Sequence, residues 1–133
     1  MIYDPDCGFC RWSLARLLSL DRPYRLRPVA LGTPEADELL ADLTPLQRSA
    51  SWHLVSPDGR RASSGSAAVP LLRLLPGGRV PAAALARMPV LTERAYRWVA
   101  DHRSTLSRAL PAASKARATE AIRRHAMQAQ INR

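Results

Sequence analysis

The first forty residues alternate between short apolar stretches and helical patterns. Residues 1–3 are apolar and predict a first strand that ends at a polar turn. Residues 8–20 follow with apolar side chains at spacings of three and four, which place them on one face of a helix. A second strand is expected over residues 25–30, where Pro28 favours a sheet edge. Thr33 then begins a short helix that is expected to end near Leu43.

The middle of the chain predicts a hairpin, and the rest predicts helices. Residues 51–55 are the clearest strand pattern, and the Ser-Pro-Asp-Gly sequence after them is typical of a tight turn. Residues 60–63 would return as the second strand of this hairpin. Helical patterns follow over residues 67–75, 81–87 and 89–107. Pro111 ends the last helix, and residues 112–133 are rich in Ala and Arg with few large apolar side chains, which indicates a mobile or weakly helical tail.

The order of these elements indicates an α/β fold. Strands and helices alternate first and an antiparallel pair follows, so we expect about four strands in one mixed sheet flanked by helices. The chain has 133 residues, which is the size of one ordinary domain. We place that domain at residues 1–108 and a basic tail, with a C-terminal helical extension, at residues 109–133.

The net charge of +9 lies entirely in the second half of the chain. Residues 1–68 hold eight acidic and eight basic side chains, whereas residues 69–133 hold three acidic and twelve basic ones. Such a basic half is suited to docking on an acidic partner. All but one of the basic residues are Arg, in a chain also rich in Ala and Pro, which indicates a GC-rich coding bias. We therefore expect no specific nucleic-acid partner.

The sequence favours a cytoplasmic protein. No apolar run reaches the roughly 18–20 residues needed to cross a bilayer, so no membrane span is expected. The N-terminus lacks the charged and apolar regions of a secretory signal. The first strand either starts at Met1 or the native start codon lies upstream of it. The pattern carries no signal for an oligomeric state.

The residues that carry chemistry are Cys7-Gly8-Phe9-Cys10, between the first strand and the first helix. Two cysteines at this spacing share a helix face, so their sulfurs can bond. Cys7 falls at the helix N-terminus, where free N–H groups and the helix dipole favour a thiolate and lower its pKa. Cys10 is expected to be more buried and less reactive. This asymmetry predicts thiol–disulfide exchange in which Cys7 attacks and Cys10 resolves the mixed disulfide.

Two other uses of the cysteine pair stay open at this point. Zinc requires four ligands, and the remaining candidates, His53, His102 and His125, are scattered along the chain. Inert thiols are the other alternative. We expect no metal, and no cofactor other than the redox-active Cys7–Cys10 disulfide.

Residues 3–10 (Tyr-Asp-Pro-Asp-Cys-Gly-Phe-Cys) resemble the opening motif of the DCC-type thiol-disulfide oxidoreductases, which are named after a D-x-x-C-x-x-C pattern. Residues 55–60, 65–68 and 95–103 are similar to the family's central hairpin, its next helix start and its late aromatic helix. The resemblance implies a thioredoxin-like fold and a disulfide oxidoreductase activity. The substrate would be an undefined disulfide or thiol, with glutathione as one candidate.

Two positions depart from this resemblance. Pro5 stands where the family motif usually has Gly, and it fixes the backbone before Cys7. Residues 49–51 are Ser-Ala-Ser, where thioredoxin-like folds commonly place a cis-proline that positions a bound peptide. Its absence weakens the expectation of general exchange with protein disulfides.

Asp4 is open to two interpretations. A buried carboxylate could take the proton when Cys10 attacks, which would make Asp4 a catalytic residue with Cys7 and Cys10. It could instead be a turn aspartate that accepts N–H bonds from the cysteine loop. The candidates for contact with substrate are Gly8, Phe9, Gly65 and Ser66, the last two because a helix start can hold a carboxylate, as it does in glutaredoxin-like proteins.

The late helix supplies one more candidate. Tyr96, Trp98 and Arg103 lie there at the spacing of core residues, so packing is expected for them. Arg103 could instead reach an anionic group. A second hypothesis for the whole chain is a non-catalytic thioredoxin-like module that docks an acidic partner through its basic C-terminal half.

Overall fold

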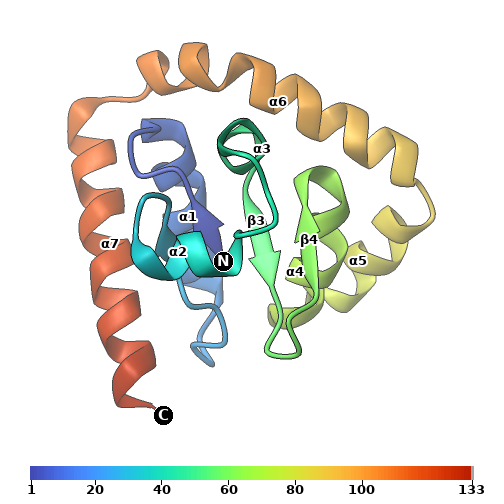
Figure 1. Ribbon diagram of the computed structural model, residues 1–133, viewed down its shortest axis with the longest axis horizontal. Helices are drawn as coiled ribbons and strands as arrows, with labels where there is room; N and C mark the ends of the chain where they lie inside the picture. Colours follow the sequence, from blue (N-terminus) through green and yellow to red (C-terminus); the bar gives the residue numbers. More distant parts are fainter. Residues whose placement is uncertain (133) are drawn as a thin grey trace.

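The computed structural model describes residues 1–132 and has a central sheet with helices on both sides (Figure 1). The sheet has four strands in the order β2-β1-β3-β4. β1 pairs with β2 in parallel and with β3 antiparallel, and β3 pairs antiparallel with β4. The predicted mixed four-stranded sheet is therefore confirmed, and the arrangement is consistent with a thioredoxin-like fold. The strands are β1 (Ile2–Tyr3), β2 (Val29–Ala30), β3 (His53–Val55) and β4 (Arg61–Ser63).

Seven α-helices accompany the sheet in the described residues, and most lie where the pattern predicts them. They are α1 (Gly8–Leu20), α2 (Pro34–Leu39), α3 (Pro45–Ala50), α4 (Ala68–Leu74), α5 (Arg79–Ala86), α6 (Pro89–Ala109) and α7 (Ala112–Ile131), with the short 3-10 helix η1 (Ser64–Ala67) before α4. The predicted second strand is shorter than expected, because only its last two residues pair with β1. Helix α3 was not predicted, although Thr44 and Gln47 carry a capping-box pattern that the structure uses.

Apolar side chains form one cluster on each face of the sheet. Ile2 of β1 and Val29 of β2 pack with residues of α2 on one face. Leu54 of β3 points to the other face, where it joins residues of α1, α4 and α7. This alternation follows from the two-residue period of a strand. The larger cluster fixes α1, so it also fixes the orientation of the cysteines at the start of that helix.

His53 of β3 lies on the α2 side and is fully buried with both ring nitrogens in hydrogen bonds. Its Nδ1 lies 2.7 Å from Ser63 Oγ, and its Nε2 lies 3.0 Å from the carbonyl oxygen of Arg48. A neutral ring satisfies both contacts when Nε2–H donates to the carbonyl and Nδ1 accepts from the hydroxyl. Burial is the main cause that lowers the pKa of His53 below its ordinary value of 6.5.

The lowered pKa of His53 predicts a loss of stability in mild acid. Below pH 6.5 the unfolded chain protonates His53 while the folded chain does not, so the free energy of unfolding falls as pH drops toward the folded-state pKa. Urea unfolding between about pH 5 and 7.5 should show a shallower decline for His53→Gln than for the wild type. His102→Gln, at an exposed position of α6, controls for the loss of a histidine as such, and the slope of His53→Gln is compared with it. An unchanged slope in His53→Gln would contradict the expectation.

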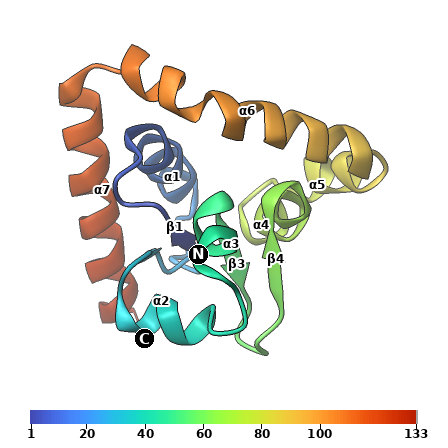
Figure 2. The same cartoon turned by 45° about the horizontal axis from the view of Figure 1, so that its top comes forward.

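Helices α6 and α7 enclose the sheet from two sides (Figure 2). Helix α6 crosses from α5 to α7 over one end of the strands, and α7 runs alongside α1. The C-terminal helical extension is thus confirmed. Helix α7, which forms this extension, is more buried than its composition suggests, because small side chains let it approach α1 closely. Its buried residues are Ala118, Ile122, His125 and Ala129. The division of the chain at residue 109 stays a prediction.

Helix α6 packs less deeply than its pattern predicts. None of its residues is buried, and the side chain of Trp98 is 58% exposed, so the expected packing role of Trp98 is wrong. The Trp98 ring stacks on the exposed His102 instead, at 4.5 Å between centroids. Within residues 1–132, no helix combines the length and apolar character that crossing a bilayer requires.

Candidate active site

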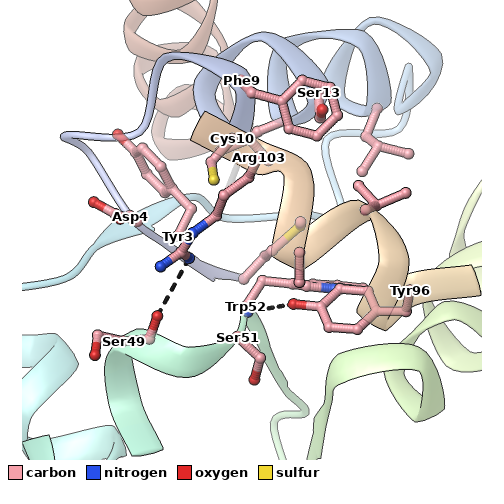
Figure 3. A pocket seen from close by; sticks show the side chains of 15 residues that line it. Tyr3, Asp4, Phe9, Cys10, Ser13, Ser49, Ser51, Trp52, Tyr96 and Arg103 are labelled. Atoms are coloured by element: carbon pink, nitrogen blue, oxygen red, sulfur yellow. Dashed lines mark hydrogen bonds between the residues drawn. The ribbon is translucent and has the colours of Figure 1, made fainter. Parts of the chain in front are cut away.

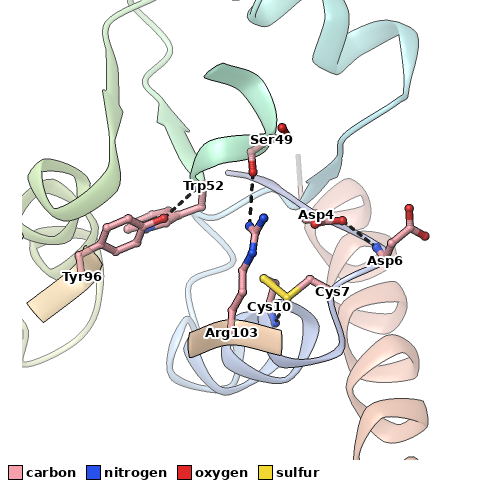
Figure 4. The surroundings of a disulfide bond; sticks show 8 residues. All are labelled: Asp4, Asp6, Cys7, Cys10, Ser49, Trp52, Tyr96 and Arg103. Atoms are coloured by element: carbon pink, nitrogen blue, oxygen red, sulfur yellow. Dashed lines mark hydrogen bonds between the residues drawn. A yellow bond between two sulfur atoms is a disulfide. The ribbon is translucent and has the colours of Figure 1, made fainter. Parts of the chain in front are cut away.

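Cys7 and Cys10 form a disulfide at the start of α1 (Figure 4). Their Cα atoms lie 5.2 Å apart, which is ordinary for bonded cysteines, so the prediction that this spacing brings the sulfurs together is confirmed. Cys7 is the N-cap of α1, and its Sγ accepts a hydrogen bond from the N–H of Cys10 at 3.2 Å. The sulfur therefore lies where the free N–H groups of the first helical turn point.

The two cysteines face different spaces. Both are half-buried, so the expected greater burial of Cys10 is not evident in their overall exposure. Cys10 lines a cavity beneath α6, whereas Cys7 lines a shallow polar depression on the adjoining surface. Arg103 and Asp4 line both spaces, so they lie at the boundary between them.

The cavity beside Cys10 has a volume of about 200 Å³ and a mainly apolar wall (Figure 3). The wall is assembled from β1, α1, α6 and the segment that joins α3 to β3. Its larger apolar and aromatic side chains are Met1, Tyr3, Phe9, Leu14, Leu17, Trp52, Tyr96 and Val99. The depression beside Cys7 is instead formed by Asp4 and Asp6 from the cysteine loop and by Arg103, Ser104, Ser107 and Arg108 from α6.

Two side chains of α6 hold the segment that forms the far wall of the cavity. The hydroxyl oxygen of Tyr96 accepts a hydrogen bond from the backbone N–H of Trp52 at 3.4 Å. The guanidinium of Arg103 passes the disulfide and donates to the carbonyl oxygen of Ser49 at 3.3 Å (Figure 4). Burial raises the pKa of the Tyr96 hydroxyl above its ordinary value, so the phenol stays neutral. Helix α6 thus forms the roof of the cavity.

Asp4 takes the turn position that one interpretation assigned to it, and it also lies at the site. Its Oδ1 accepts a hydrogen bond from the N–H of Asp6 at 2.9 Å, which closes the loop before Cys7 (Figure 4). Asp4 also lines the same cavity as Cys10. The structure therefore brings together four of the predicted site residues: Asp4, Cys7, Phe9 and Cys10.

The other three predicted site residues lie outside these two spaces. Gly8 is buried beneath the side chains of Lys115 and Ser107, where a Cβ atom would collide with both. The N–H of Gly65 donates to Glu93 Oε2 at 3.0 Å, so a carboxylate of α6 already occupies the position that was expected to hold one from substrate. The hydroxyl of Ser66 donates to the carbonyl of its own loop. The site proposed below does not include them.

Sequence reasoning did not assign Trp52 and Tyr96 to the site, and it gave Arg103 a role there only as an alternative. A signal for the α6 residues is present in the sequence. Tyr96, Val99, Ala100 and Arg103 recur at spacings of three, four and seven, which places them on one face of a helix. Their mixture of aromatic, small and cationic side chains is unusual for a core face. Nothing in the sequence, however, indicates that this face lies over the cysteines.

The described part of the chain offers no arrangement suited to a metal. No three His, Cys, Asp or Glu side chains gather in residues 1–132 as a metal site would require. Both cysteines are engaged in the disulfide with each other.

A family model described as DCC1-like thiol-disulfide oxidoreductase matches residues 1–109. The match covers most of the chain and includes the cysteine loop, the hairpin and α6, so the chain belongs to this family. Helix α7 lies beyond the matched residues. Neither a curated protein nor a solved structure matched the chain.

Proposed function

We propose that this DCC1-like protein exchanges disulfides with thiols through the Cys7–Cys10 pair, with Cys7 as the nucleophile and Cys10 as the resolving cysteine. The observation that carries the proposal is the position of Cys7. Its sulfur caps the N-terminus of α1, accepts the N–H of Cys10 and lines a surface depression. Hydrogen bonds to a thiolate and the positive end of a helix both favour the charged form, so they lower the pKa of the thiol.

The exchange proceeds in two balanced steps. The Cys7 thiolate attacks one sulfur of a substrate disulfide, which forms a mixed disulfide on Cys7 and releases the first substrate thiolate. Cys10 then loses its proton and attacks Cys7 Sγ, which closes the Cys7–Cys10 disulfide and releases the second thiolate. The substrate gains two electrons and the cysteine pair loses two. The guanidinium of Arg103, which lines the spaces beside both sulfurs, stabilises the thiolates that leave.

Asp4 is the residue that we assign to the proton of Cys10. It lines the same cavity as Cys10, and its Oδ1 is used by the N–H of Asp6, so Oδ2 is the oxygen that would take the proton. A carboxylate placed within reach of a thiol can act as its general base during the resolving step.

The pKa of Cys7 tests this proposal. In the reduced Cys10→Ser variant, the rate of alkylation by iodoacetamide as a function of pH should give a Cys7 pKa clearly below the free-cysteine value of about 8.5. The matched Cys7→Ser variant reports on Cys10, whose thiol does not cap the helix and should titrate at a higher pH.

A redox titration of the wild type against glutathione buffers supplies the second measurement. The proposal requires the Cys7–Cys10 pair to convert reversibly between dithiol and disulfide. A Cys7 pKa at or above about 8.5, together with a pair that does not cycle, would overturn it. That result is the one expected from the non-catalytic binding module.

A further inference from the structure

We infer that the substrate is a small thiol or disulfide that joins an aromatic or short apolar group to a carboxylate, with the apolar group in the cavity beside Cys10 and the carboxylate on Arg103. This inference rests on the proposed function, since it names the class of molecule that reaches the same cysteines. Three features of the structure support it: the size and apolar wall of the cavity, the guanidinium of Arg103 at its edge, and the backbone groups to which α6 is hydrogen-bonded.

The cavity has the size and surface for one small apolar group. Its volume is about 200 Å³, and engineered apolar cavities of roughly 150 Å³ in other proteins hold a benzene molecule. The rings of Phe9, Trp52 and Tyr96 line it, so a flat ring would contact aromatic faces on several sides. The polar body of a tripeptide such as glutathione would bury its amide groups against this wall without hydrogen-bond partners, which is unfavourable.

Arg103 supplies a cation at the edge of this apolar space. It is half-buried, and its one hydrogen bond in the described structure is a 3.3 Å contact with the carbonyl oxygen of Ser49. No carboxylate forms an ion pair with it among residues 1–132, although six other arginines form one. A carboxylate forms a stronger, charge-assisted and bidentate pair with a guanidinium than a carbonyl does. An anionic substrate would therefore displace the Ser49 carbonyl from Arg103.

The carboxylate of Asp4 is the group that could compete for Arg103. The structure turns it away, because Asp4 Oδ1 accepts the N–H of Asp6 in its own loop and forms no ion pair with Arg103 (Figure 4). The positive charge beside the cavity thus stays available to a ligand.

The same contacts of α6 disfavour a protein substrate. An extended peptide gains affinity by pairing its main chain with free N–H and C=O groups at a sheet edge. On the wall opposite the disulfide, the N–H of Trp52 already donates to Tyr96 and the carbonyl of Ser49 already accepts from Arg103. A peptide that paired its main chain there would have to break both contacts of α6, whereas a small carboxylate replaces only the contact of Arg103 with Ser49 and leaves that of Tyr96 with Trp52 in place.

The position of the cavity is compatible with attack by Cys7. In a mixed disulfide the C–S–S–C dihedral angle is about 90°, so the substrate carbon turns to the side of the S–S axis. A substrate sulfur bonded to Cys7 can therefore direct its ring over Cys10 and into the cavity. The released thiol of the other half leaves through the open depression beside Cys7.

Rates of exchange with three disulfides test the proposal. We would measure the second-order rate constant of the reduced wild-type protein with para-dithiodibenzoate (ring and carboxylate), dithiodipyridine (ring alone) and dithiodipropionate (carboxylate alone). Each rate is divided by that of N-acetylcysteine thiolate with the same compound, which removes differences in intrinsic reactivity. We expect the normalised rate with dithiodibenzoate to exceed each of the other two by about tenfold. Dithiodipyridine lacks the charge-assisted contact with Arg103, and dithiodipropionate lacks the buried ring.

Matched variants of α6 assign this preference to residues. Arg103→Gln should remove the advantage of dithiodibenzoate over dithiodipyridine, and Ala100→Phe, which fills the cavity, should remove its advantage over dithiodipropionate. Arg94→Gln and Ala95→Phe are the controls, since both residues are exposed on the same helix and lie outside the cavity. Equal normalised rates for the three compounds, or faster reduction of insulin than of any of them, would overturn the inference.

A binding measurement separates this inference from the proposed function. The thioether para-(methylthio)benzoate cannot exchange, so its binding to the oxidised protein by calorimetry reports on the cavity alone. Binding that is about tenfold weaker in Arg103→Gln and unchanged in Arg94→Gln supports the cavity assignment even if the cysteines do not cycle. No binding by the oxidised wild type overturns the assignment even if Cys7 proves to be a reactive nucleophile.

Discussion

Replacement of Cys7 with serine is expected to stop disulfide exchange, with a loss in rate of at least about a thousandfold. A serine hydroxyl at the N-cap of α1 keeps the hydrogen bond from the N–H of residue 10 but is not ionised near neutral pH, so it cannot attack a disulfide. The remaining thiol, Cys10, lines the cavity beneath α6 and not the open depression. A substrate disulfide therefore reaches Cys10 less easily than it reaches Cys7.

The matched variant Cys10→Ser should fail at a different step. Cys7 keeps its position and attacks, but no second thiol resolves the mixed disulfide. With an excess of dithiodibenzoate, the reduced wild type should release two thiols per chain, whereas Cys10→Ser should release one and retain the other on Cys7. Intact-mass analysis before and after reduction measures the retained group directly.

The two variants also define what would contradict these roles. If Cys7→Ser kept a rate within about tenfold of the wild type, Cys10 would be the attacking cysteine and the cavity would be its approach path. If the reduced wild type also released one thiol per chain and retained the other group on Cys7, Cys10 would not resolve the mixed disulfide and the pair would not act as a couple.

The local part of the fold follows from the sequence because local signals control it. Residues 8–20 form α1 with the predicted bounds, since apolar spacing, the cap at Cys7 and the stop at Asp21 act within a few residues of one another. The hairpin of β3 and β4 follows from its Pro-Asp-Gly turn in the same way. Helix α3 is also predictable from the sequence, because its capping box is a local signal of the same kind.

Only part of the candidate site can be predicted from the sequence, because the rest depends on contacts between residues that are distant in the chain. The cysteine loop places Asp4, Cys7 and Cys10 together within seven residues of chain, and the structure keeps them together. The roof of the cavity comes from α6, nearly ninety residues later, and contacts at such a distance depend on how the whole chain packs. Apolar spacing on α6 predicts core packing, whereas in the structure one face of the helix covers a cavity and none of its residues is buried.

Burial of α7 illustrates a second limit of pattern-based prediction. Large apolar side chains are the usual signal of a docked helix, and residues 112–131 carry few of them. The structure docks this helix through alanines, one isoleucine and polar contacts, the buried ones made by His125 Nε2 with Asp21 and with the carbonyl oxygen of Leu26. A buried polar pair of this kind joins residues more than a hundred positions apart, so neither residue signals it alone.

Removal of the Asp21 carboxylate is expected to be the most destabilising change at this contact. Asp21 is the C-cap of α1, and its side chain is fully buried. Oδ1 accepts the N–H of Arg25 at 3.1 Å, Oδ2 accepts the N–H of Leu26 at 2.7 Å, and Oδ2 lies 3.3 Å from His125 Nε2. Asp21→Ala leaves the N–H groups of Arg25 and Leu26 without their acceptor and removes the carboxylate beside His125, whose Nε2 keeps the carbonyl oxygen of Leu26 at 3.1 Å. We therefore expect the free energy of unfolding in urea to fall by about 3 kcal/mol.

Related variants separate the buried contact from a general effect of losing a carboxylate. Asp101→Ala, at an exposed position of α6, should change the free energy of unfolding by no more than about 0.5 kcal/mol. Asp21→Asn keeps an oxygen for one N–H and should recover part of the loss. In a double-mutant cycle, Asp21→Ala and His125→Ala should couple by about 1 kcal/mol, because either substitution alone removes the buried contact between the two side chains. Additive effects of the two substitutions would show that the 3.3 Å contact does not hold α7 on α1.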